Sequence, residues 1–164
     1  MRILAIDPGN TQSAWVLIDA DTYAPLAFAK QDNTTIRDHL RWGAFEQADT
    51  VAVEMIAAYG MSVGADVFET CVWIGRFVEL FAPTGGVELV ERHPIKLHHC
   101  RSAKANDTNI RQALVDRFAP GERNHGKGVK AAPGFFYGFA ADCWQAYALA
   151  VYLADTLTGQ ADTA

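Results

Sequence analysis

The sequence RILAIDPGNTQSAWVLID, residues 2–19, predicts a β-hairpin that brings a carboxylate to the edge of a sheet. An apolar run leads to Asp7, the residues Pro8–Gly9–Asn10 turn the chain, and a second alternating strand follows from Ala14 to Ile18. A carboxylate that ends a buried strand is costly in free energy unless a partner neutralises it. The hairpin therefore predicts that a divalent metal, a metal-held phosphate or a basic side chain lies near Asp7.

The composition predicts a globular, cytoplasmic domain. The chain has 164 residues and 50% of them are apolar, which is enough for one core and too many for disorder. We expect a single domain over residues 1–158 and a short polar tail over residues 159–164. The three cysteines are an odd number without framework spacing, as in reduced intracellular proteins. The apolar stretch 139–157 contains two aspartates, so it is too polar for a membrane span.

The charge is unevenly distributed along the chain. A net charge of −5 argues by itself against a nucleic-acid partner. Residues 91–130 nevertheless carry nine Lys or Arg against four acids, which suits a face that contacts a polyanion. An ordinary solvated helix with basic loops is the alternative, and the charge alone leaves both open.

The order of the expected elements indicates a mixed sheet with helices on both faces. We expect strands at about 2–7, 13–19, 25–30, 50–54 and 87–91, and helices at about 34–46, 64–82, 94–100, 107–118 and 138–157. Three strands in a meander, followed by strands that alternate with helices, predict three antiparallel and then two parallel strands. Residues 120–134 read as a basic loop rich in Gly and Pro.

Three acids that follow apolar runs are candidate metal ligands. Asp7 ends the first expected strand, Glu54 ends the fourth, and Asp142 lies in the first turn of the last helix. Carboxylates that converge at one edge repel one another unless an ion such as Mg²⁺ or Mn²⁺ lies between them. Two such ions can activate a water and stabilise the leaving oxygen of a phosphodiester. Each acid also has a structural alternative, which is a turn for Asp7, a surface strand end for Glu54 and the helix dipole for Asp142.

Four motifs in this order resemble those of the RuvC Holliday-junction resolvases of the RNase H-like superfamily. They are IDPGN at 6–10, VAVE at 51–54, IKLHHCRSAKANDTNIRQALVDRF at 95–118 and AADCWQAYALAVYL at 140–153. The stretch YGMSVGADVFETCVWIGRF at 59–77 resembles the RuvC-like proteins of bacteriophages in particular. The resemblance covers nearly the whole chain.

This resemblance implies an RNase H-like α/β fold in which helices flank both faces of a five-stranded mixed sheet. It also implies a homodimeric, crossover-junction endodeoxyribonuclease that uses two Mg²⁺ or Mn²⁺ ions per site and cuts symmetric strands of branched DNA. No nucleotide cofactor and no membrane are expected, and a bacteriophage protein of this kind would act in the host cytoplasm. Carried over by motif, Asp7, Glu54 and Asp142 are metal ligands, and Lys96 matches a DNA-contacting lysine.

The chain departs from the family pattern at two positions. The family usually places a fourth ligand three residues before the last one, where this chain has Phe139. Eleven residues beyond Lys96, where the bacterial enzymes carry a second functional lysine, this chain has Asp107. We hypothesise that Asp107 supplies the missing carboxylate as a catalytic metal ligand. The alternative is that Asp107 only caps its helix.

Further DNA contacts are expected from the basic segment and from the loop after Glu54. The basic candidates are Arg101, Lys104, Arg111, Lys127 and Lys130. Tyr59 and Met61 follow Glu54 where the family inserts an aromatic wedge, and they could stack on an unpaired base or pack in the core. The neighbouring residues His98, His99 and Cys100 cannot readily share one zinc ion, so we interpret the histidines as surface or DNA-proximal.

Two other functions remain open. One is a catalytically weakened protein that binds branched DNA on the same fold, because Phe139 cannot bind metal. The other is a branch or flap nuclease with less selectivity. Actin-like ATPases and sugar kinases also begin with a strand, Asp-x-Gly and a hairpin, but they need a duplicated domain and more than twice this length.

Overall fold

The computed structural model describes residues 1–164 except 59, 61, 82–85, 141 and 160–164. The strands of the main sheet are β1 (Arg2–Asp7), β2 (Gln12–Asp19), β3 (Pro25–Asp32), β4 (Thr50–Met55) and β5 (Glu88–Glu91). The helices are α1 (Asn33–Arg41), α2 (Ala65–Phe81), α3 (Arg92–Cys100), α4 (Asp107–Phe118) and α5 (Cys143–Thr158). A separate small hairpin consists of β6 (Gly128–Val129) and β7 (Ala132–Pro133), within the stretch that the sequence predicts to be a loop.

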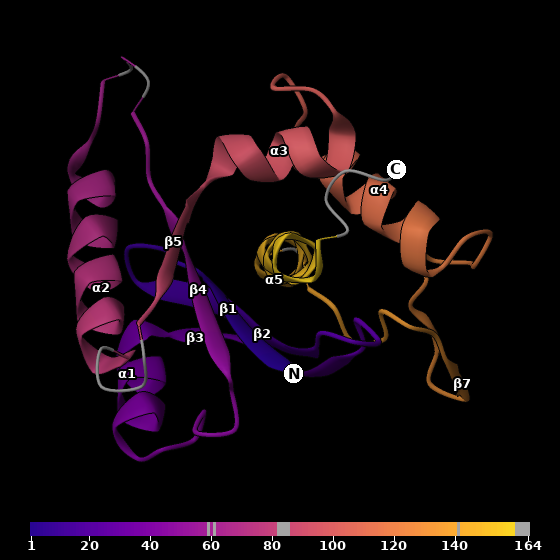
Figure 1. The fold of residues 1–164 in the computed structure, drawn as a ribbon, viewed down its shortest axis with the longest axis horizontal. Coiled ribbons are helices and arrows are strands. Elements are labelled where there is room, and N and C mark those ends of the chain that lie inside the picture. The colour runs from indigo at the N-terminus through magenta and orange to yellow at the C-terminus, as the bar shows by residue number, and fades with distance from the viewer. Residues whose placement is uncertain (59, 61, 82–85, 141, 160–164) are drawn as a thin grey trace.

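The main sheet has the mixed topology that the sequence predicts. Its strand order is β3-β2-β1-β4-β5 (Figure 1). The pairs β1–β2 and β2–β3 are antiparallel, whereas β1–β4 and β4–β5 are parallel. The parallel pairing aligns Ile6 with Val53, so β1 and β4 end side by side.

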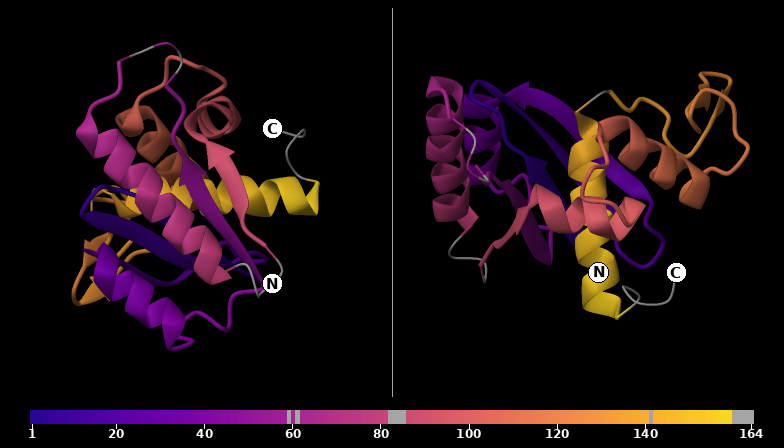
Figure 2. Two further views of the ribbon diagram at one scale, coloured as in Figure 1. Left: turned by 90° about the vertical axis from the view of Figure 1, so that its left-hand side faces the viewer. Right: turned by 90° about the horizontal axis from the view of Figure 1, so that it is seen from above.

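Each face of the sheet has its own core, as the alternation of β1 requires. Ile3 and Ala5 point to the side of α5, and Leu4 and Ile6 point to the side of α1 and α2. The views in Figure 1 and Figure 2 place α1 and α2 on one side of the sheet and α5 on the other. Because α3 and α4 pack on the outer side of α5, this helix is apolar nearly all round.

The turn between β1 and β2 is held without the Asp7 side chain. The Gly9 amide donates to Ser13 Oγ at 3.2 Å, and Asn33 Nδ2 donates to the Gly9 carbonyl oxygen at 2.8 Å. A Cβ on Gly9 would lie 2.3 Å from the Gln12 carbonyl oxygen, so the turn requires glycine. The interpretation of Asp7 as a hydrogen-bonded turn residue is therefore wrong.

Two helices are shorter than the sequence predicts. The first ends at Arg41 rather than near residue 46, since Gly43 has φ +73° and the chain turns there. The last begins at Cys143 rather than near residue 138, because Gly138 has φ +85°, outside the helical region. Asp142 is thus the N-cap residue of α5 and does not lie in its first turn. Among the described residues, none of the helices combines the length and apolar character of a membrane span.

Candidate active site

Four separate segments bring carboxylates to one edge of the sheet. Asp7 and Glu54 leave the adjacent ends of β1 and β4. Asp107 is the first residue of α4, and Asp142 directly precedes α5. All three of the other carboxylates are near enough for their charges to raise the pKa of Asp7. We call these four residues the acidic cluster.

Asp7 is the one member of the acidic cluster that forms no ion pair with a described residue. It accepts no hydrogen bond from any residue that the structure describes. Burial, and after it the charge of Glu54, raises the pKa of Asp7 to about 8, while Arg92 acts in the opposite direction. Burial likewise raises the pKa of Glu54, against the lowering effect of Arg92. The carboxyl groups of Asp7 and Glu54 therefore ionise less readily than usual unless a cation is near.

The guanidinium of Arg92 lies inside the acidic cluster. Its Nη1 donates to Glu54 Oε2 at 3.0 Å, and its Nη2 donates to both Asp107 and Gln145. The side chains of Arg92 and Glu54 are only 20% and 16% exposed, so the bridge between them is largely out of water. Arg92 thereby ties the end of β4 to the starts of α4 and α5.

Asp142 has a basic partner of its own. It forms an ion pair with Lys30 of β3, and both side chains are about two-fifths exposed. Its carboxylate makes no capping hydrogen bond to the α5 backbone. A hollow of about 150 Å³ separates it from Asp107. The hollow is lined by Asp107, Thr108, Arg111, Asp142, Trp144 and Gln145.

The structural alternatives for two other acids are wrong. Glu54 is largely buried and so is not a surface acid at a strand end. Asp107 does not cap α4, because the side chain of Asn106 accepts from the Asn109 amide at 3.0 Å and completes a capping box. The Asp107 carboxylate is 69% exposed and bonded to Arg92 instead. Its position therefore needs an explanation other than capping.

The donor set of the acidic cluster fits a hard divalent ion. Carboxylate oxygens are the preferred ligands of Mg²⁺ and Mn²⁺, and the raised pKa of Asp7 means that its carboxylate becomes fully charged at neutral pH only when a cation is near. Within the described part of the chain, no three His, Cys, Asp or Glu side chains converge tightly enough to hold one ion. Arg92 and Lys30 instead occupy the carboxylates of Glu54, Asp107 and Asp142. These acids would have to exchange their basic partners in order to ligate a metal.

Phe139 fills the position at which the family pattern has a fourth ligand. It is 2% exposed and packs edge-on against Phe28 and Trp144. This position is therefore part of the core and offers no polar atom. Among the described residues that line the hollow, Asp107 is the only acid besides Asp142.

The expected DNA-contacting residues lie at different distances from the acidic cluster. The charge of Lys96 acts on the pKa of Glu54, and Arg111 lines the hollow beside Asp107. The structure places the others farther along the chain, on the exposed turn after α3 and around the β6–β7 hairpin: Arg101, Lys104, Lys127 and Lys130. Tyr59 and Met61 lie outside the described residues.

Two residues of the site were missed from the sequence. In the sequence, Arg92 is one of nine bases of the segment 91–130 and has no role of its own. Gln145 is only a polar residue of the last expected helix. The signal for Arg92 is its place directly after β5, which pairs Val90 with Glu54. A side chain that follows a strand adjacent to β4 emerges beside the end of β4.

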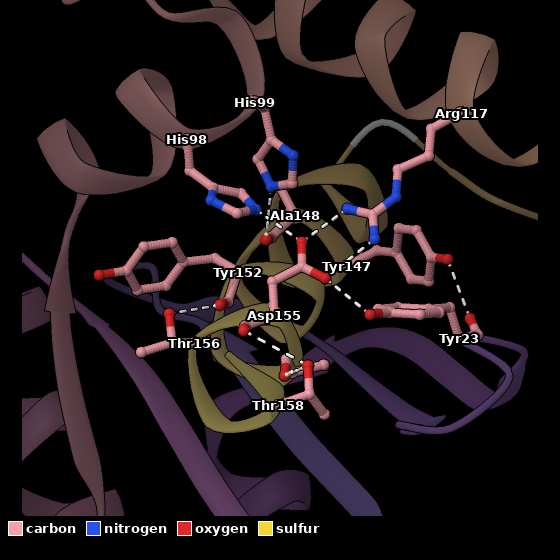
Figure 3. Close-up of polar contacts among 11 residues, drawn as sticks. Tyr23, His98, His99, Arg117, Tyr147, Ala148, Tyr152, Asp155, Thr156 and Thr158 are labelled. Atoms are coloured by element: carbon pink, nitrogen blue, oxygen red, sulfur yellow. Dashed lines mark hydrogen bonds and ion pairs between the residues drawn. The ribbon is translucent and has the colours of Figure 1, made fainter. Parts of the chain in front are cut away.

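A second polar cluster lies in the interior beside α5 and corrects the interpretation of the histidines (Figure 3). The carboxylate of Asp155, 1% exposed, accepts from Tyr23, His98 and both terminal nitrogens of Arg117 at 2.6–2.9 Å. His99 Nε2 donates to the Ala148 carbonyl oxygen at 2.9 Å. His98 and His99 are therefore structural residues, and the interpretation of them as surface residues is wrong.

The comparisons with known proteins identify the fold. No family model and no curated protein matches this chain. The structure is similar to that of Thermus thermophilus RuvC, with a TM-score of 0.67 and 16% identity over 97% of both chains. It is also similar to T. thermophilus RuvC in complex with a Holliday junction substrate, with a TM-score of 0.64 and 16% identity over 97% of this chain and 96% of that one. Neither is a bacteriophage protein, so the particular likeness to bacteriophage enzymes has no support here.

Proposed function

We propose that this chain, which has the fold of the RuvC resolvases, is a metal-dependent endonuclease that cuts branched DNA, four-way junctions above all. The observation that carries the proposal is the acidic cluster. Its carboxylates come from four segments that are distant in sequence, and the other three lie close to the half-buried Asp7 at the ends of two parallel strands. Such clustering costs free energy in the absence of a cation and has no role in the packing of the core.

In this proposal the acidic cluster holds Mg²⁺ or Mn²⁺, two ions per site. The ions would supply an activated water and stabilise the leaving oxygen of the phosphodiester. Cleavage in this way would produce 5′-phosphate and 3′-hydroxyl ends. Asp7 and Glu54 are fixed by the sheet and would anchor the ligand set. Asp107 would replace the ligand that is missing at Phe139, since it faces Asp142 across the hollow.

The basic segment would bind the DNA around the acidic cluster. Of the predicted DNA contacts, Lys96 and Arg111 lie nearest and suit phosphates next to the cut. The other bases would bind the arms of the junction: Arg101, Lys104, Lys127 and Lys130. Tyr59 and Met61 remain proposed contacts to unpaired bases. That T. thermophilus RuvC has been solved with a Holliday junction substrate supports this class of DNA.

A homodimer would supply the two sites that paired cuts require. Helix α2 offers a surface for it, because Phe68 and Val72 lie one turn apart and are 62% and 54% exposed. A second copy of the chain that covered these side chains would remove them from water. Their exposure supports the proposed association of two copies.

Phe139 favours a second candidate, a branched-DNA-binding protein with weakened catalysis. The buried ring removes one ligand of the family pattern. If Asp107 does not replace that ligand, binding would persist while cleavage is lost.

The substrate range tests the proposal. Labelled four-way junction, Y-fork and linear duplex are incubated with Mg²⁺ or Mn²⁺, with the Asp7→Asn variant as control. We expect cleavage of the junction in preference to the duplex and no cleavage by the variant. Binding of the junction without cleavage would favour the second candidate, and equal cleavage of all three substrates would indicate an unselective nuclease.

A further inference from the structure

We infer that Arg92 is an exchangeable counter-ion of the acidic cluster: it neutralises Glu54 and Asp107 in the free protein, and a divalent ion displaces it. The displaced guanidinium then becomes a ligand for a phosphate of the bound DNA. The inference rests on the proposed function, because it concerns the same site and the same metal.

The contacts of Arg92 use the atoms that a metal would need. Its Nη1 donates to Glu54 Oε2 at 3.0 Å, and its Nη2 donates to Asp107 Oδ1. A divalent ion ligated by these two oxygens would compete with the guanidinium for their lone pairs and would place a second cation beside it. Binding of the ion and the present position of Arg92 therefore oppose each other.

The charges of the site also favour exchange. The acidic cluster has four carboxylates, and Arg92 and Lys30 are the basic side chains paired with them. Two divalent ions would balance four carboxylates without help. Once they are bound, the guanidinium is a surplus positive charge beside two cations, and Coulomb repulsion drives it toward the nearest anion.

The contacts of Arg92 differ from those of a purely structural ion pair elsewhere in the molecule. Asp155 is 1% exposed and accepts four hydrogen bonds, two of them from Arg117. Asp107, in contrast, is 69% exposed, and its one bond to a described residue is that of Arg92. An exposed partner is resolvated at little cost when the pair opens. The Asp107 half of the Arg92 bridge therefore opens at little cost, whereas the largely buried Glu54 half opens only when another cation takes the place of the guanidinium.

The backbone keeps the displaced guanidinium near the reaction. Arg92 is the first residue of α3, and Ile95, one turn further, is fully buried against the core. The backbone of Arg92 therefore stays in place when its side chain moves, and the guanidinium remains within reach of the acidic cluster. A guanidinium there presents a planar fork of donors, which matches the oxygens of a phosphodiester.

Calorimetric titration with Mn²⁺ of the full-length protein, without DNA, tests the exchange. We expect Arg92→Gln to bind Mn²⁺ roughly fivefold more tightly than the wild type, because the competing cation is gone. Arg92→Lys, which keeps the charge but not the fork, should bind with intermediate affinity. Arg41→Gln removes an equal charge from the C-terminal end of α1 and should leave the affinity unchanged.

Cleavage of the four-way junction at saturating Mn²⁺ provides the second readout. Arg92→Gln should cut about a hundredfold more slowly although it binds the ion more tightly. A residue with a merely structural role would weaken both properties together. An unchanged or weaker Mn²⁺ affinity in Arg92→Gln, with a wild type that binds Mn²⁺ and cuts, overturns this inference alone. A wild type that neither binds Mn²⁺ nor cuts overturns the proposed function, and this inference with it.

Discussion

The Asp155→Asn substitution should destabilise the fold by about 3 kcal/mol while it leaves the acidic cluster in place. The Asp155 carboxylate is 1% exposed, and its two oxygens accept from Tyr23, His98 and Arg117. An asparagine retains one acceptor oxygen and turns an NH₂ donor toward other donors. The substitution therefore leaves buried hydrogen bonds unmade and the charge of Arg117 without its counter-ion.

The magnitude follows from the exposure of the two partners. Removal of one partner of a fully buried pair costs about 3–5 kcal/mol. We take the low end because the Arg117 side chain is 37% exposed and can recover some solvation. For a chain of 164 residues, about 3 kcal/mol corresponds to a decrease in Tm of roughly 6–12 °C.

Thermal unfolding followed by circular dichroism at neutral pH measures this decrease. Asp116→Asn is the matched control, since Asp116 is an exposed acid of α4 whose partner is Gln112. We expect the control to unfold within about 2 °C of the wild type. A Tm of Asp155→Asn equally close to the wild type would refute the view that this cluster stabilises the packing around α5.

Three further predictions concern pH, the fourth carboxylate and salt. Burial lowers the pKa of His99 to about 4, whereas the unfolded chain takes up the proton near 6.5. Acidification from pH 7 to pH 5 should thus lower the free energy of unfolding, measured with urea, by about 2 kcal/mol. The His99→Gln variant should show a smaller change in that free energy over the same pH range. Asp107→Asn should reduce junction cleavage at low Mg²⁺ at least tenfold; near-normal rates there would end its proposed role as a ligand. Junction affinity should decrease steeply between about 50 and 200 mM salt, and a flat response would contradict phosphate binding by the basic segment.

The sheet could be predicted from the sequence because its signals are local. Alternation in residues 2–19 and the β-branched run before Glu54 identify the strands, and their order limits the topology. The start of α5 could not be predicted, since residues 138–142 are compatible with a helix. The left-handed backbone of Gly138 ends that possibility, and Phe139 packs instead against Phe28, a contact between distant segments.

Three acids of the site, Asp7, Glu54 and Asp142, were predictable because each one follows an apolar run, and Asp107 was predicted from its place in the family pattern. The role of Arg92 was not, because a base in a basic segment has no signature until β5 is paired with β4. The buried histidines left a usable signal, since Ile95, His98 and His99 share one face of a helix at i, i+3 and i+4. That spacing points the two rings at the same neighbour as the buried isoleucine, which is α5.

The most direct measurement of the central claim is the single-turnover cleavage of an end-labelled four-way junction by the wild type and by Asp7→Asn. The account predicts paired nicks with 5′-phosphate ends that require Mg²⁺ or Mn²⁺ in the wild type. It also predicts that Asp7→Asn binds the junction but does not cut it. Cleavage by Asp7→Asn at the wild-type rate, or no cleavage by the wild type with either ion, would contradict the account.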